Sequence, residues 1–276
     1  MGKTDLTFNV LIAAMDETDF SLVRKMNLNA DCIMANQTDN TSKGEIDING
    51  YKVTVVNSTI KGLAANRNLA LENSAADIVL FADDDMVYRD DMPQGVVSAF
   101  LSNPKADVII FGCTETDGEG NILREYANTN KRKIGLSALK YPTYIIAARR
   151  KSLKRKKIRF SQMFGIGSAY SLGEDTVFLA DCFKKLLKVY TSDFNIGTSS
   201  KDLHWFQGYT EKFFFDKGAL YRHIFGPLAP LYALYYSRKY EKLSGVSHKK
   251  IMRYMENGIL DYAHKIKTNR INKSGM

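Results

Sequence analysis

The segment at residues 77–86 (DIVLFADDDM) constrains the fold of this chain more than any other, because a short apolar run leads directly into three consecutive carboxylates. Residues 78–81 have the uninterrupted apolar character of a strand that is buried on both faces of a parallel sheet. In open α/β sheets, ligands bind beyond the carboxyl ends of the strands. The acids that follow, Asp83, Asp84 and Asp85, therefore predict a polar site at that edge.

The spacing of these acids favours a bound cation. Asp83 and Asp85 point to the same side of an extended chain, and two carboxylates so close repel each other unless one is protonated or a cation lies between them. Hard oxygen ligands suit Mg²⁺ or Mn²⁺, which usually complete their coordination with water and substrate phosphates. The motif thus favours a site for a divalent metal and a diphosphate, although acid-rich segments also form ordinary solvated turns and helix caps.

Composition indicates a folded protein of a reducing compartment. In 276 residues, 45% hydrophobic content is ample for a core. Three widely spaced cysteines, without CxxC spacing, favour neither a zinc site nor a disulfide framework. The first residues lack a signal-peptide pattern, and the longest nearly apolar stretch, 224–236, is too short to cross a bilayer. We expect a cytoplasmic protein, with attachment at the inner face of the plasma membrane as an option.

Positive charge is concentrated in two regions. Residues 131–160 contain twelve Lys and Arg and no acid, and residues 237–276 contain ten against three acids, so the rest of the chain is net acidic although the total is +9. Local basic surfaces indicate a polyanionic partner, such as anionic lipid, a lipid-linked diphosphate or nucleic acid. A solvated basic face is the alternative. No nucleic-acid-binding motif accompanies the charge, so we expect no nucleic-acid partner.

Strand-like and helix-compatible segments alternate in the first half of the chain. This order favours a mostly parallel sheet flanked by helices, and TDGEGN at 116–121 predicts a hairpin. A boundary is expected near residue 225, after which the sequence is aromatic, basic and helical in pattern, giving units at 1–225 and 226–276. The expected strands are 6–14, 31–36, 51–57, 77–82 and 107–112, and the expected helices are 19–26, 61–72 and 92–101.

A second acidic motif follows in FGIGSAYSLGEDTVFL at 164–179. Its glycines allow backbone to approach a ligand closely, and an acid pair at the start of a helix is stabilised by the helix dipole. Glu174 and Asp175 either cap that helix or supply the general base that the first site would need.

Taken together, these segments resemble family 2 glycosyltransferases of the GT-A fold, which are inverting nucleotide-sugar transferases of bacterial polysaccharide synthesis. The resemblance covers roughly residues 8–221 and rests on the order and spacing of its motifs. These motifs are FNVLIA (8–13), ANQTD (35–39), KGLAANRNLAL (61–71), FADDD (81–85), FGIG (164–167), GEDTVFL (173–179) and GYTEKFFFDKGALY (208–221). The implied fold is a Rossmann-like mixed sheet flanked by helices, with a C-terminal helical appendage.

The resemblance implies a donor site for a nucleotide-diphosphate sugar, most simply a UDP-sugar. Asp85 corresponds to the direct metal ligand of a DxD-type motif, and Asp83, with Asp84 beside it, to a contact with the ribose or with the water shell of the metal. Arg67 corresponds to an arginine near the diphosphate or base, and its alternative is a salt bridge on a helix surface. Asp39 resembles an acid that reads the uracil edge, although a turn-forming aspartate explains the same letters.

The resemblance also implies the catalytic step. Asp175 corresponds to the base that accepts the proton of an acceptor hydroxyl, while Glu174 orients that base or binds the acceptor. His204 corresponds to a further metal or diphosphate contact, and Trp205 to a stacking surface for the acceptor sugar. A surface histidine beside a core tryptophan is the alternative. Lys212 is expected to contact phosphate, and a surface lysine without a role in the site is the alternative.

The expected function is therefore transfer of one sugar to a glycan or lipid-linked acceptor. A sugar-1-phosphate nucleotidyltransferase would also use acids and an α/β sheet, but its Gly-rich signature near the first strand is missing. A catalytically degenerate GT-A protein that binds membranes or polyanions is the other alternative. After residue 226, apolar side chains recur at helical spacing between basic ones, which suits helices that dock on a membrane, on the domain or on another copy of the chain. These positions are Ile251, Tyr254, Met255, Ile259, Tyr262 and Ile266.

Overall fold

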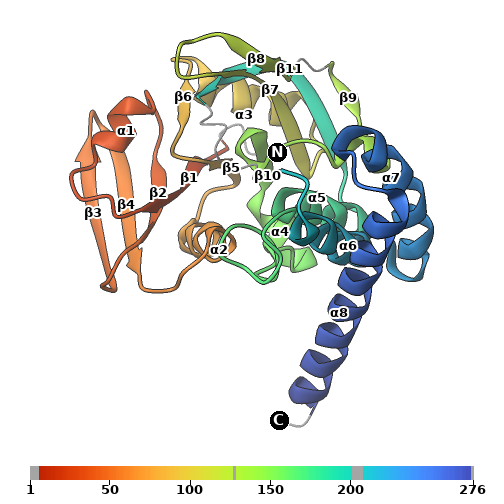
Figure 1. Ribbon diagram of the computed structural model, residues 1–276. Helices are drawn as coiled ribbons and strands as arrows, with labels where there is room; N and C mark the ends of the chain where they lie inside the picture. The colour runs from red at the N-terminus through yellow and green to blue at the C-terminus, as the bar shows by residue number, and fades with distance from the viewer. Residues whose placement is uncertain (1–5, 127–128, 201–207, 275–276) are drawn as a thin grey trace.

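The computed structural model describes residues 6–126, 129–200 and 208–274, and its centre is a mixed β-sheet (Figure 1). Within these residues the order of the strands is β3-β4-β2-β1-β5-β10-β7-β11-β6, with β8 beside β7 and β9 beside β11. The strands are β1 (Phe8–Met15), β2 (Cys32–Gln37), β3 (Ser42–Ile48), β4 (Tyr51–Ser58), β5 (Ile78–Ala82), β6 (Met86–Tyr88), β7 (Val108–Thr116), β8 (Ile122–Glu125), β9 (Lys131–Arg132), β10 (Ile146–Arg149) and β11 (Val189–Ser200).

Helices flank this sheet and extend the chain at its C-terminal end. They are α1 (Ser21–Lys25), α2 (Leu63–Asn73), α3 (Met92–Ser102), α4 (Arg150–Lys156), α5 (Glu174–Lys184), α6 (Glu211–Phe225), α7 (Ala229–Ser244) and α8 (His248–Ser274), with short 3₁₀ turns η1 (Leu136–Ala138), η2 (Thr143–Ile145) and η4 (Gly226–Leu228). The predicted α/β class, with a mixed sheet between helices, is confirmed.

Four neighbouring strands in the first half of the sheet are parallel and bring their carboxyl ends to one edge, while β3 pairs antiparallel with β4 at the border of the sheet. β4, β2, β1 and β5 are neighbours in register, so their carboxyl ends, including Gln37 and Ala82, lie together. Each strand and helix expected in this half is present, and β7 and β8 form the hairpin predicted at 116–121. The structure adds two strands in this half that were not expected, β3 and β6. It also adds β10, which runs antiparallel between β5 and β7 in the middle of the sheet. Its four residues were too short a run to stand out within the basic segment.

An aromatic cluster joins the sheet to α5. Phe81 of β5 packs edge-on against Phe160 and Phe178, at ring-centroid distances of 5.0 and 5.3 Å, and these two rings stack on each other at 4.5 Å. Edge-to-face and offset-stacked rings are the preferred aromatic arrangements. The cluster therefore fixes the start of α5 relative to the end of β5, where the predicted site residues lie.

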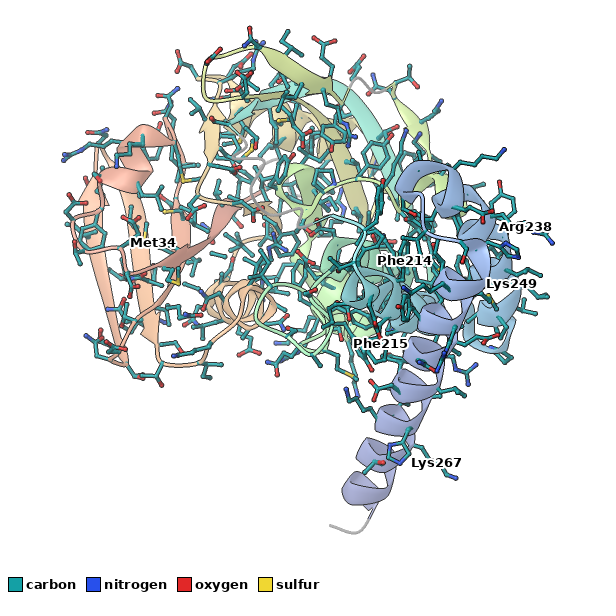
Figure 2. The ribbon with its side chains drawn as sticks, in the orientation of Figure 1. Met34, Phe214, Phe215, Arg238, Lys249 and Lys267 are labelled. Atoms are coloured by element: carbon teal, nitrogen blue, oxygen red, sulfur yellow. The ribbon has the colours of Figure 1, made fainter. Side chains whose placement is uncertain are left out.

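Helices α6, α7 and α8 pack together as a three-helix unit, from which the end of α8 projects (Figures 1 and 2). α6 and α8 cross at two glycines: a Cβ at Gly218 would overlap the Met255 carbonyl, and one at Gly258 would overlap the Phe215 carbonyl. Only glycine permits so close an approach of two helix backbones. The expected boundary near residue 225 falls between α6 and α7, inside this unit, and the division into 1–225 and 226–276 stays a prediction.

The apolar face of α8 packs within its own chain. Ile251, Met255 and Ile259 are buried in a cluster with Phe214 and Tyr221 of α6. Of the three docking options that the sequence left open for this face, the structure shows packing on the domain. Among the residues that the structure describes, no helix is both long and apolar enough to span a bilayer.

Candidate active site

The site is built around Arg67, a fully buried arginine in the middle of α2. Its side chain is only 2% exposed, and its guanidinium lies 5.3 Å from the centre of the Phe160 ring. α2 begins after Gly62, whose φ of 113° suits glycine and whose N–H donates to Gln37 Oε1 at 2.9 Å. Charged side chains are almost never fully buried unless they are paired. The partners of Arg67 therefore identify the site.

Three carboxylates surround this guanidinium. Nη2 donates to Asp83 Oδ1 at 2.6 Å, and Nη1 donates to Asp175 Oδ1 at 3.2 Å and lies 3.7 Å from Glu174 Oε1. Asp83 comes from the turn after β5, whereas Glu174 and Asp175 form the first turn of α5. The structure thus brings together four of the predicted site residues from three separate parts of the sequence.

The loop before α5 positions the acid pair. Gly173, with φ of 92°, precedes the helix, and a Cβ added there would lie 2.9 Å from Leu220 of α6. Gly165, with φ of 104°, lies so close to Glu174 that an added Cβ would be 3.3 Å from its side chain. The glycines of the FGIG and LGED motifs are therefore required by close packing and by backbone conformation.

A threonine that sequence reasoning missed completes the contacts of Asp175. Thr143, fully buried in η2, donates its hydroxyl to Asp175 Oδ1, and the neighbouring Tyr144 donates its hydroxyl to Glu115 of β7. Two carboxylates therefore hold η2 in place, one through Thr143 and the other through Tyr144. No sequence signal marks Thr143, because it lies in an irregular segment far from Asp175 along the chain.

Burial and neighbouring carboxylates raise the pKa of both acids of the pair. Burial, then the neighbouring Asp175 charge, raises the pKa of Glu174 to about 7 from its ordinary 4.5, against the lowering effect of Arg67. Burial likewise raises the pKa of Asp175, although Arg67 and the Thr143 hydroxyl favour its ionised form. Burial would lower the pKa of Arg67, but the surrounding carboxylates raise it, so the guanidinium stays charged. Asp175 keeps 29% of its side chain exposed and can be reached from solvent.

The remaining acids of the first motif lie beside this cluster. Asp85 accepts a hydrogen bond from the Ser199 hydroxyl of β11 at 2.9 Å, and Asp84 is exposed. Asp39 is exposed in the loop after β2, at the same edge of the sheet as the acids after β5. Across residues 6–126, 129–200 and 208–274, no group of three or more His, Cys, Asp or Glu side chains could hold a metal ion by itself.

Lys212, a predicted contributor, lies apart from this cluster. The Lys212 ammonium donates to the fully buried Asp216 carboxylate and to the Ala169 carbonyl at 3.1 Å, and Asp216 also accepts from the Ser171 hydroxyl at 2.7 Å. These contacts tie α6 to the loop before α5 and do not include the Arg67 cluster. His204 and Trp205 lie outside the described residues.

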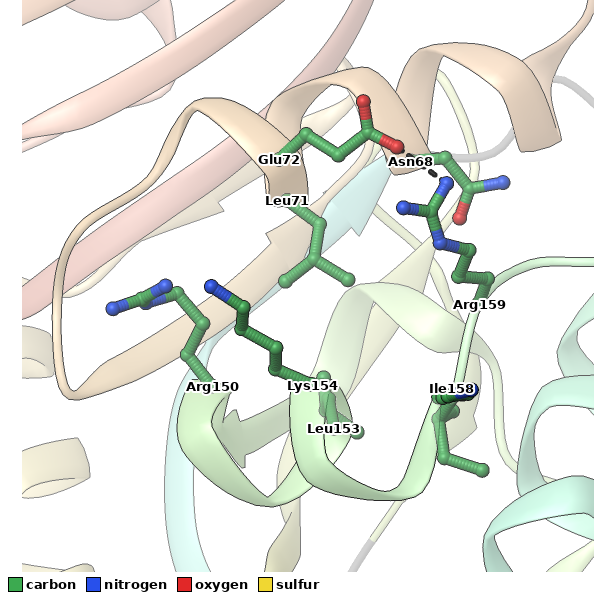
Figure 3. A pocket seen from close by; sticks show the side chains of 9 residues that line it. Asn68, Leu71, Glu72, Arg150, Leu153, Lys154, Ile158 and Arg159 are labelled. Carbon is green, nitrogen blue, oxygen red and sulfur yellow. Dashed lines mark ion pairs between the residues drawn. The ribbon is translucent and has the colours of Figure 1, made fainter.

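A separate cavity of about 520 Å³ lies between α2 and α4 (Figure 3). Leu71 points from α2 into this space, while Arg150 and Lys154 extend toward it from α4. Arg159 lies at its rim and pairs with Glu72 at 2.5 Å. Part of the basic segment at 131–160 therefore lines a concave surface and is not spread over a convex face.

Comparison with known proteins identifies the fold and the family. The family model described as glycosyl transferase family 2 matches residues 21–172, more than half of the chain. The structure is similar to that of Staphylococcus aureus TarS 1–349 in complex with UDP-GlcNAc, at a TM-score of 0.59 and 15% identity, over 80% of this chain and 67% of that chain. No curated protein matches the chain in sequence.

Two further TarS structures match equally well. The S. aureus TarS 1–349 structure gives a TM-score of 0.58 at 12% identity, over 94% of this chain and 73% of that chain. Another S. aureus TarS structure gives 0.57 at 13% identity, over 80% of this chain and 40% of that chain. These likenesses show a common GT-A fold, and the family match shows the enzyme class. The chain is therefore a glycosyltransferase, and it belongs to glycosyl transferase family 2.

Proposed function

We propose that the enzyme transfers one sugar from a UDP-linked donor to a hydroxyl of a glycan or lipid-linked acceptor, with inversion at the sugar C1. The observation that carries this proposal is the convergence of Asp83, Glu174 and Asp175 on the buried Arg67 at the carboxyl edge of the sheet. Ligands of open α/β sheets bind at such edges. The UDP-GlcNAc complex of TarS, which shares the fold, supports the choice of nucleotide.

Asp175 acts as the general base in this proposal. It accepts the proton of the acceptor hydroxyl, whose oxygen attacks C1 from the face opposite the diphosphate, so that the bond from C1 to the diphosphate oxygen breaks as the new glycosidic bond forms. A base works best when its pKa lies near the operating pH, and burial raises the pKa of Asp175. Thr143 and Arg67 hold its carboxylate, and Glu174 orients it.

In this proposal Arg67 contributes to the donor site by holding the Asp83 carboxylate in place. Its two Nη atoms already contact carboxylates, so it aligns Asp83 and Asp175 and neutralises part of their charge. The further donor contacts that we propose are Asp83, with Asp84 beside it, for the ribose, and Asp39 for the uracil edge. Lys212, held by Asp216, contributes by fixing the loop that precedes α5.

A divalent metal fits the acids after β5 as a complex with the donor. Mg²⁺ and Mn²⁺ are often held by one or two carboxylates together with substrate phosphates, so Asp83 and Asp85 suffice without a third protein ligand. His204 is a proposed additional ligand. When bound, such an ion would neutralise charge on the departing diphosphate.

The cavity between α2 and α4 supports an anionic acceptor. Arg150, Lys154, Lys157 and Arg159 line it against a single acid, Glu72, so its net charge suits the phosphates of a lipid-linked acceptor. The alternative function, a degenerate GT-A protein that binds polyanions, would use the same basic cavity but would show no turnover.

Calorimetry with UDP, GDP and CMP, each with Mn²⁺ and then with EDTA, tests the donor assignment. We expect metal-dependent binding of UDP, and failure of every nucleotide to bind would favour the degenerate alternative. Asp175→Asn keeps the shape of the side chain but removes its basicity, so transfer should fall while UDP binding persists. Asp193→Asn, at an exposed aspartate of β11, is the matched control. Transfer by Asp175→Asn at the wild-type rate would contradict the base assignment.

A further inference from the structure

An apolar stripe lies exposed on the outer side of η4 and α7. Leu228, Leu231, Leu234 and Tyr235 are 56%, 64%, 40% and 66% exposed. Their spacing of three and four residues places them on one face of the helix. Single exposed leucines are common on protein surfaces, but contiguous apolar patches mark sites of interaction.

The packing of α7 leaves this stripe unused within the described chain. Its opposite face holds Ala229, Ala233 and Ser237, all buried, and Tyr232 stacks on Phe225 at a ring-centroid distance of 3.5 Å. The packing among α6, α7 and α8 therefore does not use the exposed side chains of the stripe. The apolar face of α8, in contrast, packs on α6 through Ile251, Met255 and Ile259.

Charge is arranged along α7 in a way that indicates the partner. Residues 226–236 contain no charged side chain, whereas exposed Arg238, Lys239 and Lys242 follow within the next two turns. The start of α8 adds exposed Lys249, and Figure 2 shows Arg238 and Lys249 on the same outer side of the unit. Apolar residues beside Lys and Arg are the signature of a helix that lies in the interface of an anionic bilayer.

We propose that the outer face of η4 and α7 docks this enzyme on an anionic membrane surface. The leucines and Tyr235 enter the boundary between headgroups and acyl chains, while Arg238, Lys239 and Lys242 reach anionic headgroups with their long side chains. The proposal rests on the proposed function in one respect only, because a lipid-linked acceptor would be presented at the same surface.

A second copy of the chain is a poorer partner for this face. In an antiparallel pair that overlapped along the whole of α7, the apolar first half of one helix would face the basic second half of the other. In a parallel pair, like charges would face each other. An anionic bilayer can contact the apolar first half of α7 with its acyl chains and the basic second half with its headgroups.

Flotation of the full chain with vesicles tests the proposal. We expect binding to phosphatidylcholine vesicles that contain phosphatidylglycerol and little binding to phosphatidylcholine alone. The double variant Leu231→Gln/Tyr235→Gln should bind about tenfold or more weakly, because it removes two of the inserted apolar side chains. Leu101→Gln, at an exposed leucine of α3, is the matched control and should bind as the wild type does.

Two measurements separate the possible failures. Arg238→Gln/Lys242→Gln should weaken binding to the anionic vesicles and leave the weak binding to neutral ones unchanged. Absence of flotation, flotation unaffected by the α7 variants, or a dimer in light scattering that Leu231→Gln/Tyr235→Gln splits would each overturn the proposal. UDP calorimetry on the same variants should give wild-type affinity, so a failure of the donor assignment is recognised independently of the membrane result.

Discussion

Glu174→Gln should change how the stability of this enzyme depends on pH. Glu174 is 15% exposed, and its pKa of about 7 lies above the ordinary 4.5 because its ionised form is buried beside Asp175. Each pKa unit corresponds to 1.36 kcal/mol, so ionising Glu174 costs the folded state about 3 kcal/mol. Glutamine has similar shape and cannot ionise, so this cost is absent from the variant.

The sign of the effect follows from proton linkage. A carboxyl with a raised folded-state pKa contributes stability that is complete below its unfolded pKa and is lost as the pH rises through the folded pKa. The wild type should therefore lose about 3 kcal/mol relative to Glu174→Gln between about pH 4.5 and pH 8.

Urea unfolding followed by circular dichroism, repeated across this pH range, measures the difference. Glu125→Gln, at an exposed glutamate of β8, is the control and should unfold in parallel with the wild type. Parallel curves for Glu174→Gln and the wild type would refute the reasoning, since they would mean that Glu174 ionises in the folded state as easily as in water.

Three further substitutions test the site and the helix crossing. Arg67→Met should lower the free energy of unfolding by about 3–5 kcal/mol near neutral pH, because it leaves buried carboxylates without their cation; urea titration checks this, and a loss below about 1 kcal/mol would contradict it. Thr143→Val should slow transfer about tenfold at unchanged UDP affinity and raise the apparent pKa of the base, because the Thr143 hydroxyl favours the ionised form of Asp175; a pH–rate profile and calorimetry decide, and equal rates would contradict it. Gly258→Ala should lower the melting temperature by several degrees, since the added methyl parts α6 from α8; thermal unfolding measures it, with no change as the opposing result.

Local pattern was enough to predict the parallel strands β1, β2, β4 and β5, but not β3 or β6. The apolar run at β5 and the acids after it follow from strand periodicity and from the rule that such sheets bind ligands at their carboxyl edge. β10 could not be predicted this way, because a four-residue strand is defined by its neighbours β5 and β7.

The same limit applies to the candidate site, where local motifs could be predicted but tertiary contacts could not. Asp83 was marked by its own motif, and the family resemblance assigned Arg67, Asp83 and Asp175 to one site. Their direct pairing depends on tertiary packing and was not predicted. Thr143 was missed because a lone threonine in an irregular segment carries no pattern. The apolar face of α8 was recognised, yet its partner was not, since the periodicity of a helix is the same whether it packs on protein or lipid.

The glycines of the C-terminal half have a structural consequence. Gly173, two residues before Asp175, packs on Leu220 of α6, while Gly218 and Gly258 hold α6 against α8 with no space for a methyl group. These close contacts connect α8 to α6 and α6 to the residue that precedes the acid pair. The C-terminal helices therefore contribute to the placement of Asp175, although none of their described side chains belongs to the Arg67 cluster.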